Sequence, residues 1–100
     1  MGQYFTAVNL DKEEYVDGHD IDNGAKLLEQ VGWMGSTSTA LWLLLADNSD
    51  ARLEHAYVSR WAGDRIIVLG DYGNMDLCET VDEEYTNISA GVKEMLEELL

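Results

Sequence analysis

All three arginines of this chain lie within one short stretch, at Arg52, Arg60 and Arg65. Arg60 and Arg65 enclose a Trp-Ala-Gly-Asp sequence, and two guanidinium groups flanking a loop can hold a carboxylate or phosphate through paired hydrogen bonds. Trp61 offers a stacking surface, and Asp64 can orient an arginine. We therefore predict an anion-binding site around this loop. The candidate ligand-binding residues are Arg52, Arg60, Trp61, Asp64, Arg65, Asp71 and Tyr72.

The same loop has a structural interpretation. Both arginines can pair with the chain's own carboxylates, Trp61 can pack in the core, and Ala62 and Gly63 can form the turn of a hairpin. Residues 51–70 differ in charge from the rest of the chain, because three arginines there oppose Glu54 and Asp64 for a sum of +1. The sequence leaves the binding and structural interpretations open.

A second candidate site follows the first predicted hairpin. Its potential metal ligands are Asp17, His19, Asp20 and Asp22. Carboxylate and carbonyl oxygens are the ligands that Ca²⁺ and Mg²⁺ prefer, although the spacing here is not that of an EF-hand. The alternative is helix capping, in which Asp22 or Asn23 accepts the free amide hydrogens of a first helical turn.

Catalytic interpretations have less support. His19 or His55 could act as a general base, and Cys78 could act as a nucleophile, but no local motif joins them. The chain has no nucleophile elbow, phosphate-binding glycine loop or zinc-protease motif. We expect Cys78, the one cysteine, to be a buried and inert thiol.

Composition narrows the class of protein. The chain has 100 residues, 20 acidic against 6 basic side chains and a net charge of −14. Direct nucleic-acid binding is disfavoured because it needs a cationic surface. The longest apolar run is too short to cross a membrane, and no signal peptide is recognisable, so we predict a cytoplasmic protein. A chain of this length is expected to form one globular domain, residues 1–100.

Hydrophobic periodicity predicts an α+β fold. Its antiparallel sheet of about four strands is built from two hairpins, and about three helices pack on it. The predicted hairpins pair 3–9 with 14–16 and 55–60 with 65–69, an extended segment covers 77–81, and the helices span 24–31, 36–46 and 90–100. Helix 36–46 is apolar nearly all round and should be central. Strand 66–69 lacks alternation and should be covered on both faces.

Three segments carry a family resemblance. They are residues 1–15, the Arg-Trp-Ala-Gly-Asp-Arg to Gly-Asp-Tyr segment at 60–72, and Tyr-Thr-Asn-Ile-Ser at 85–89. Together they resemble a family of small uncharacterised microbial proteins, and the resemblance implies no activity. Twenty acids against three lysines also suggest a haloarchaeal protein, because dense carboxylates keep a protein soluble where molar salt screens their repulsion.

Two classes of function follow. The first is a non-enzymatic binding or interaction protein that uses the Arg60 to Arg65 loop to contact a protein or a small anionic ligand. The alternative is a metal-assisted enzyme that uses the Asp17 to Asp22 loop with a histidine. No cofactor is predicted beyond Ca²⁺ or Mg²⁺ at that loop. The chain is expected to be a monomer or a homodimer, with the apolar side of its last helix buried within the chain.

Overall fold

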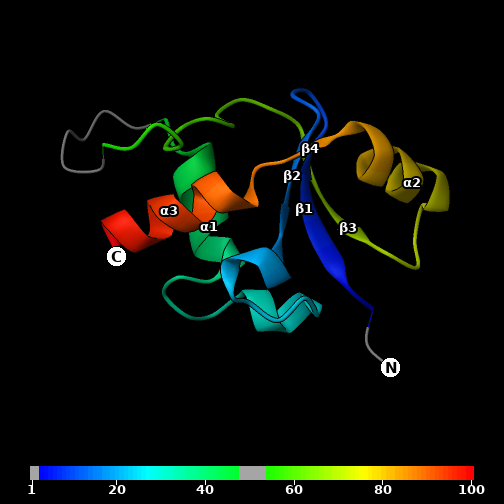
Figure 1. Cartoon of the computed structure of the whole chain (residues 1–100), viewed down its shortest axis with the longest axis horizontal. Coiled ribbons are helices and arrows are strands. Elements are labelled where there is room, and N and C mark those ends of the chain that lie inside the picture. Colours follow the sequence, from blue (N-terminus) through cyan, green and yellow to red (C-terminus); the bar gives the residue numbers. More distant parts are fainter. Residues whose placement is uncertain (1–2, 48–53) are drawn as a thin grey trace.

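The computed structural model describes residues 3–47 and 54–100, and it has the predicted α+β fold (Figure 1). The strands are β1 (Phe5–Asn9), β2 (Glu14–Asp17), β3 (Ile66–Gly70) and β4 (Thr86–Asn87). The α-helices of the described residues are α1 (Thr37–Leu45), α2 (Met75–Glu84) and α3 (Ser89–Leu99), and two 3₁₀ helices are η1 (Gly18–Ile21) and η2 (Leu27–Gln30). The radius of gyration, 13.1 Å, is that of one compact domain of this length.

The four strands form one mixed sheet in the order β3-β1-β2-β4. β1 pairs antiparallel with β2 and with β3, whereas β2 pairs parallel with β4. The first predicted hairpin is therefore confirmed. The prediction of a purely antiparallel sheet is wrong, because β4 arrives from α2 and runs in the same direction as β2.

The second predicted hairpin does not form. Residues 56–63 fold as successive turns, and β3 pairs with β1 instead. The reason lies at the end of α1, where the last carbonyl groups of a helix have no partner within the helix. Ser59 and Trp61 donate their backbone N–H groups to the carbonyls of Leu43 and Leu44, at 2.9 and 2.8 Å. Those amides are thus unavailable to a strand ladder.

Helices cover both faces of the sheet. α1 and α3 lie on one face and α2 lies on the other (Figure 1). Because side chains alternate along a strand, Ala7 and Val16 contact the α1–α3 layer whereas Val8 contacts the α2 layer. β3 is nevertheless an edge strand, and Ile67 and Val68 are 37% and 48% exposed, so the prediction of full coverage is wrong at these two positions.

Two further segments differ from the sequence prediction. Residues 77–81 are part of α2 rather than extended, because Asn74 caps the helix by accepting the Leu77 N–H. The predicted helix 24–31 is reduced to η2, and Asn23 does not cap it. The side chain of Asn23 is buried and accepts instead from the N–H and hydroxyl of Thr37 at the start of α1.

The last helix has the predicted position, and its apolar side is buried within the chain through Val92, Met95 and Leu96. The start of this helix is bound to β2 and to β4. Ser89 accepts the N–H of Asp17 through its hydroxyl, and the Asn87 side chain accepts the N–H of Ser89. None of the described helices is long and apolar enough to span a membrane.

Candidate functional site

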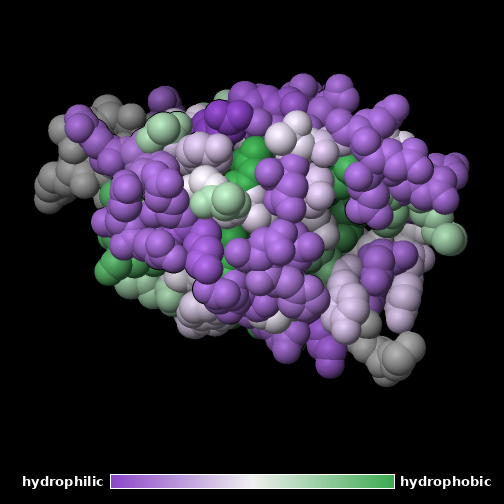
Figure 2. Space-filling view, viewed as in Figure 1, coloured by the Kyte–Doolittle hydropathy of each residue, from purple (hydrophilic) through white to green (hydrophobic). Residues whose placement is uncertain are grey.

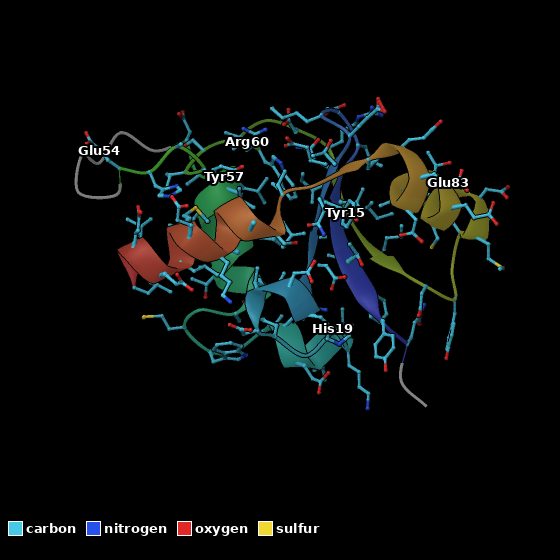
Figure 3. The ribbon with its side chains drawn as sticks, in the orientation of Figure 1. Tyr15, His19, Glu54, Tyr57, Arg60 and Glu83 are labelled. Carbon is cyan, nitrogen blue, oxygen red and sulfur yellow. The ribbon has the colours of Figure 1, made fainter. Side chains whose placement is uncertain are left out.

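The arginine loop, residues 60–65, packs against the turn that joins β1 and β2. Arg60 donates from Nε to Glu14 Oε1 at 3.0 Å and from a terminal nitrogen to Glu14 Oε2, and the Trp61 indole N–H donates to Glu14 Oε1 at 2.9 Å. Glu14 and Trp61 are 6% and 0% exposed. The Arg60 guanidinium also lies 5.0 Å from the ring centre of Tyr57, and both residues are labelled in Figure 3.

This contact changes the protonation of Glu14. Burial favours the uncharged carboxyl group, but the hydrogen bonds from Arg60 and Trp61 together outweigh it, so the pKa of Glu14 is lowered. The hydrogen bond to Glu14 likewise raises the pKa of Arg60. A buried carboxylate that accepts from three donors is therefore the centre of this loop.

The other end of the loop is tied to the same turn. Asp64 accepts from Asn9 Nδ2 at 2.8 Å and from Lys12 Nζ, and these hydrogen bonds, that of Lys12 first, lower the pKa of Asp64. Arg65 donates its backbone N–H and its Nε to the two carboxylate oxygens of Asp11, at 2.7 and 2.9 Å. The backbone bond and then the side-chain bond lower the pKa of Asp11.

The arrangement matches the structural interpretation of the loop. Trp61 belongs to the core, Arg60 is paired with Glu14 at the start of β2, and Arg65 is paired with Asp11 in the β1–β2 turn. Arg52 lies outside the described residues. Asp71 and Tyr72 follow β3, whereas Arg65 precedes it, and a five-residue strand separates them by roughly 17 Å. The six candidate residues that the structure describes thus do not converge on one site.

The predicted metal loop is also divided among separate partners. Asp17 accepts the N–H of His19, Asp20 accepts from Asn87 Nδ2 at 2.9 Å, and Asp22 pairs with Lys93 at 3.1 Å. The ring of His19 lies edge-on to Tyr4, with ring centres 5.5 Å apart. His19 Nδ1 also lies 3.9 Å from Asp17 Oδ1, but Asp20 and Asp22 are bound to other elements, so the four side chains do not form one coordination sphere.

Within residues 3–47 and 54–100, one other group of three potential ligands has its atoms within 4.8 Å of one another: His55, Glu94 and Glu98. His55 Nε2 lies 3.3 Å from Glu94 Oε1 and 3.4 Å from Glu98 Oε2. The spacing Glu94 to Glu98 places both carboxylates on one face of α3. No signal in the sequence links these two acids to His55.

The other nitrogen of the His55 ring decides what this cluster does. Nδ1 accepts the backbone N–H of Tyr57 at 3.1 Å, so the proton of the neutral ring is on Nε2 and points toward the two carboxylates. A metal ion at Nε2 would require that proton on Nδ1, opposite another donor. The cluster therefore suits a hydrogen-bonded link between α3 and the segment before the arginine loop.

A hollow of about 150 Å³ lies between the sheet and α2. It brings together Asp71, Asp17 and Asp82 with the Tyr15 phenol and the Cys78 thiol. Burial first, and then the neighbouring aspartates, raise the pKa of both Tyr15 and Cys78. The phenol and thiol are thus held in their protonated forms, and neither is an activated nucleophile.

The most unusual surface of the molecule is apolar. We use the name apolar face for the exposed residues Leu27, Leu28, Val31, Trp33, Met34, Trp42, Leu45, Val68 and Leu100. Leu28, Met34 and Trp42 are 79%, 78% and 81% exposed. Figure 2 shows hydrophilic residues over most of the viewed side, with hydrophobic residues at its margin beside the C-terminal end of α3.

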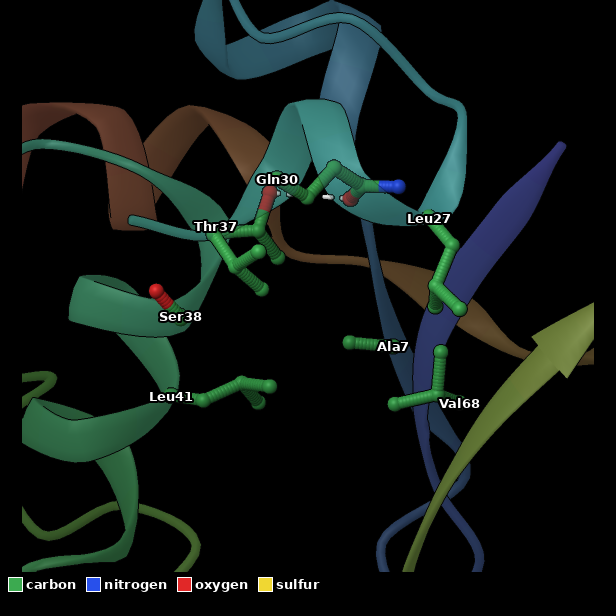
Figure 4. Close-up of a pocket in the computed structure, with 8 residues that line it drawn as sticks. Ala7, Leu27, Gln30, Thr37, Ser38, Leu41 and Val68 are labelled. Carbon is green, nitrogen blue, oxygen red and sulfur yellow. Dashed lines mark hydrogen bonds between the residues drawn. The ribbon is translucent and has the colours of Figure 1, made fainter. Parts of the chain in front are cut away.

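Two hollows make this face continuous. The first, about 60 Å³, lies between α1, η2 and the β1–β3 edge, and Leu27, Leu41 and Val68 face one another across it (Figure 4). The second, about 370 Å³, is lined by Trp42, by Leu99 at the end of α3 and by Leu100 directly after it. Ser38 lines both hollows, so the two hollows meet at the middle of α1.

The apolar face corrects one prediction about α1. Thr37, Ala40 and Leu44 are buried, but the opposite side of the helix is on the surface. The helix is therefore not central, although its sequence is apolar all round. The signal that could have identified the face is the absence of charge: residues 27–46 contain one charged side chain, Glu29, in a chain of which 26% is charged.

Comparisons of this chain with protein-family models, with curated proteins and with solved structures find no significant match.

Proposed function

We propose that this protein is a non-enzymatic interaction domain and that it binds another protein chain through the apolar face. The observation that supports this proposal is the exposure of Trp42, Met34 and Leu28 in the least charged part of a chain with a net charge of −14. Soluble proteins seldom expose a continuous apolar surface of this kind unless it contacts a partner, and tryptophan and methionine are enriched in such contacts.

The arginine loop gives less support to a binding function. Its guanidinium groups are paired with Glu14 and Asp11, and a ligand that used them would first have to displace those carboxylates. Removing Arg60 from Glu14 would leave a buried carboxylate without its main partner, which is costly. The loop therefore supports the fold, and the apolar face is the better candidate for binding.

The metal-assisted enzyme has no comparable support. In the Asp17 to Asp22 loop, Asp20 and Asp22 are bound to Asn87 and Lys93, away from the contact between Asp17 and His19. The Cys78 thiol and the Tyr15 phenol are held protonated. These contacts give no support to a catalytic function.

The proposal can be tested by oxidative footprinting of the methionines in an extract of the cells that produce the protein. Met34 is on the apolar face, and Met75, 69% exposed at the start of α2, is a matched internal control on the other layer of the molecule. We expect the oxidation of Met34 to slow several-fold in the extract relative to the dilute purified protein, with Met75 unchanged. Equal oxidation rates of Met34 in the two samples would refute the proposal.

A further inference from the structure

We propose that the chain bound at the apolar face is a second copy of this protein, with the two α1 helices packed antiparallel across a two-fold axis. This inference rests on the proposed function and names its partner. In such an arrangement every contact occurs twice, because the same surface is used by both copies.

The charge distribution favours a second copy. Two chains of −14 each can approach closely only where neither brings carboxylates to the contact. Residues 27–46 meet that condition, since Glu29 is their one charged side chain. Val68, Leu99 and Leu100, which complete the two hollows, are also uncharged side chains. The apolar face is thus the part of the described surface where self-repulsion is weakest.

A basic partner fits this face less well. Electrostatic steering places acidic side chains in or around the surface that a cationic partner contacts. Here the acids gather elsewhere: five lie in α2, on the other face of the sheet, and Glu94 and Glu98 are turned toward His55. A cationic partner would be drawn to those surfaces rather than to the apolar face.

An acidic partner is disfavoured for a related reason, since four of the five lysines and arginines in residues 3–47 and 54–100 are already paired with carboxylates of the chain, the exception being Lys26. Lysines and arginines with carboxylate partners are Lys12 with Asp64, Arg60 with Glu14, Arg65 with Asp11, and Lys93 with Asp22. The apolar face itself has no cationic side chain to offer.

The shape of α1 suits a helix–helix contact. Ser38, Leu41, Trp42 and Leu45 recur at the spacing of one helix face, which lies beside the face of the buried Thr37, Ala40 and Leu44. The small Ser38 lies between the two hollows, one turn from the large Trp42. When two α1 helices pack antiparallel, Trp42 of each copy can lie over Ser38 of the other, where the backbone can be approached closely.

The face extends far enough beyond α1 to support a stable contact. A methyl group placed on Gly35 would lie within 4 Å of both Trp33 and Leu100, and Trp42 and Leu100 line the same hollow. On the other side of α1, Leu27 and Val68 line the smaller hollow. A stable dimer needs about 800 Å² from each partner. A helix face flanked by apolar side chains on both sides is the kind of surface that supplies it.

The experiment is sedimentation equilibrium of the purified chain in molar KCl, comparing the natural sequence with Trp42→Glu and Met75→Glu. Both substitutions replace a largely exposed apolar side chain with one carboxylate, so both should leave the fold intact, which circular dichroism checks. We expect the natural chain and Met75→Glu to have twice the mass of one chain. Trp42→Glu should weaken the dimer by more than about tenfold, because it places two like charges across the axis.

Two further readouts make the result decisive. Dimerisation should strengthen as KCl is raised, because salt screens the repulsion of the two copies, whereas binding of a basic chain would weaken. In the purified protein, oxidation of Met34 should slow as protein concentration rises, with Met75 unchanged. Met34→Glu provides a second variant on the face should Trp42→Glu fail to fold.

A natural chain that stays monomeric at its highest soluble concentration in molar KCl would overturn self-association, as would a dimer that Trp42→Glu and Met34→Glu leave unaffected. If the chain is monomeric but Met34 is still protected from oxidation in the cell extract, the proposed function holds and the partner is a different chain. If Met34 were unprotected in both settings, the proposed function would fail as well.

Discussion

At the scale of single residues, Glu14 has the largest structural role in the region first considered for binding. It is a carboxylate inside the molecule, and its three donors come from Arg60 and Trp61. The sequence indicated that Arg60 and Trp61 belong together, and it left open whether a ligand or the chain itself would occupy the guanidinium. It could not identify Glu14 among twenty acids, because nothing local distinguishes this glutamate from Glu13 beside it.

We predict that Glu14→Gln lowers the free energy of unfolding by about 2 kcal/mol, since an amide N–H donor would then face a terminal nitrogen of Arg60, and the half-buried charge of Arg60 would lose its carboxylate partner. The matched control is Glu13→Gln, which removes the same charge from an exposed neighbour and should change stability by less than about 0.5 kcal/mol. Chemical denaturation in molar KCl measures both. Equal effects of the two substitutions would contradict the role assigned to Glu14.

The same pair of variants gives a pH signature. The pKa of Glu14 in the folded protein is below its ordinary value of 4.5, so its stabilising contribution is present above pH 4.5 and is lost as pH falls through the lowered value. The natural chain should therefore lose more stability on acidification than Glu14→Gln, and the two curves should converge at low pH. Curves that remain parallel would show that Glu14 is not the group responsible.

At the scale of elements, the sequence predicted the strands and helices whose hydrogen bonds join residues that are close together in the chain. The β1–β2 hairpin, α1 and α3 are formed by short-range pairing and helical periodicity, and all three were predicted. The errors fall where distant groups decide. Backbone N–H groups of residues 56–63 bind the free carbonyls at the end of α1. The side chain of Asn23 accepts from Thr37 instead of capping a helix that begins at residue 24. The error at α2 is different. Residues 77–81 were predicted to be extended, although the Asn74 cap and the spacing of Leu77 and Val81 are local signals of a helix.

The packing of α3 against the segment before the arginine loop gives an element-scale prediction. Alanine in place of glycine normally stabilises a helix by up to about 1 kcal/mol. A methyl group at Gly91, however, would overlap the ring of Tyr57, which is held against the core and beneath Arg60. We expect Gly91→Ala to destabilise the protein, since overpacking costs about 1–3 kcal/mol.

The control for this prediction is the same substitution in a Tyr57→Ala background, where the ring is absent and the ordinary helix preference should return. Thermal unfolding of the four proteins in the cycle measures the change of sign. A stabilising Gly91→Ala in the natural chain would show that α3 does not pack closely on this segment.

At the scale of the whole molecule, the dominant property is unpaired negative charge. Glu83 and Glu84 are exposed at the C-terminal end of α2, where a helix dipole disfavours carboxylates, and Figure 3 shows Glu83 on that helix. The sequence predicted this character fully, because charge is a sum over residues. It could not predict that α1 would keep one apolar side on the surface, since an evenly apolar helix does not reveal which side the core will take.

We predict that the free energy of unfolding rises steeply between 0.1 and 1 M KCl, because the Debye length shortens from about 10 to about 3 Å over that range. The double substitution Glu83→Lys with Glu84→Lys should stabilise the protein at low salt by about 1 kcal/mol and have a smaller effect at high salt. Urea denaturation across a KCl series measures both trends. Stability that does not change with salt would contradict the halophilic character proposed for the chain.

The parallel pairing of β4 with β2 has a consequence for biosynthesis. The strand Thr86–Asn87 and the buried side chains Ile88, Val92 and Met95 are made long after β1 and β2, yet they complete the sheet and close the core around Val16 and Leu44. In a nascent chain that has left the ribosome only as far as α2, the core side chains around Val16 and Leu44 are therefore still uncovered, beside the apolar surface of α1. Productive folding must await α3, and until then the growing chain is the form most exposed to aggregation.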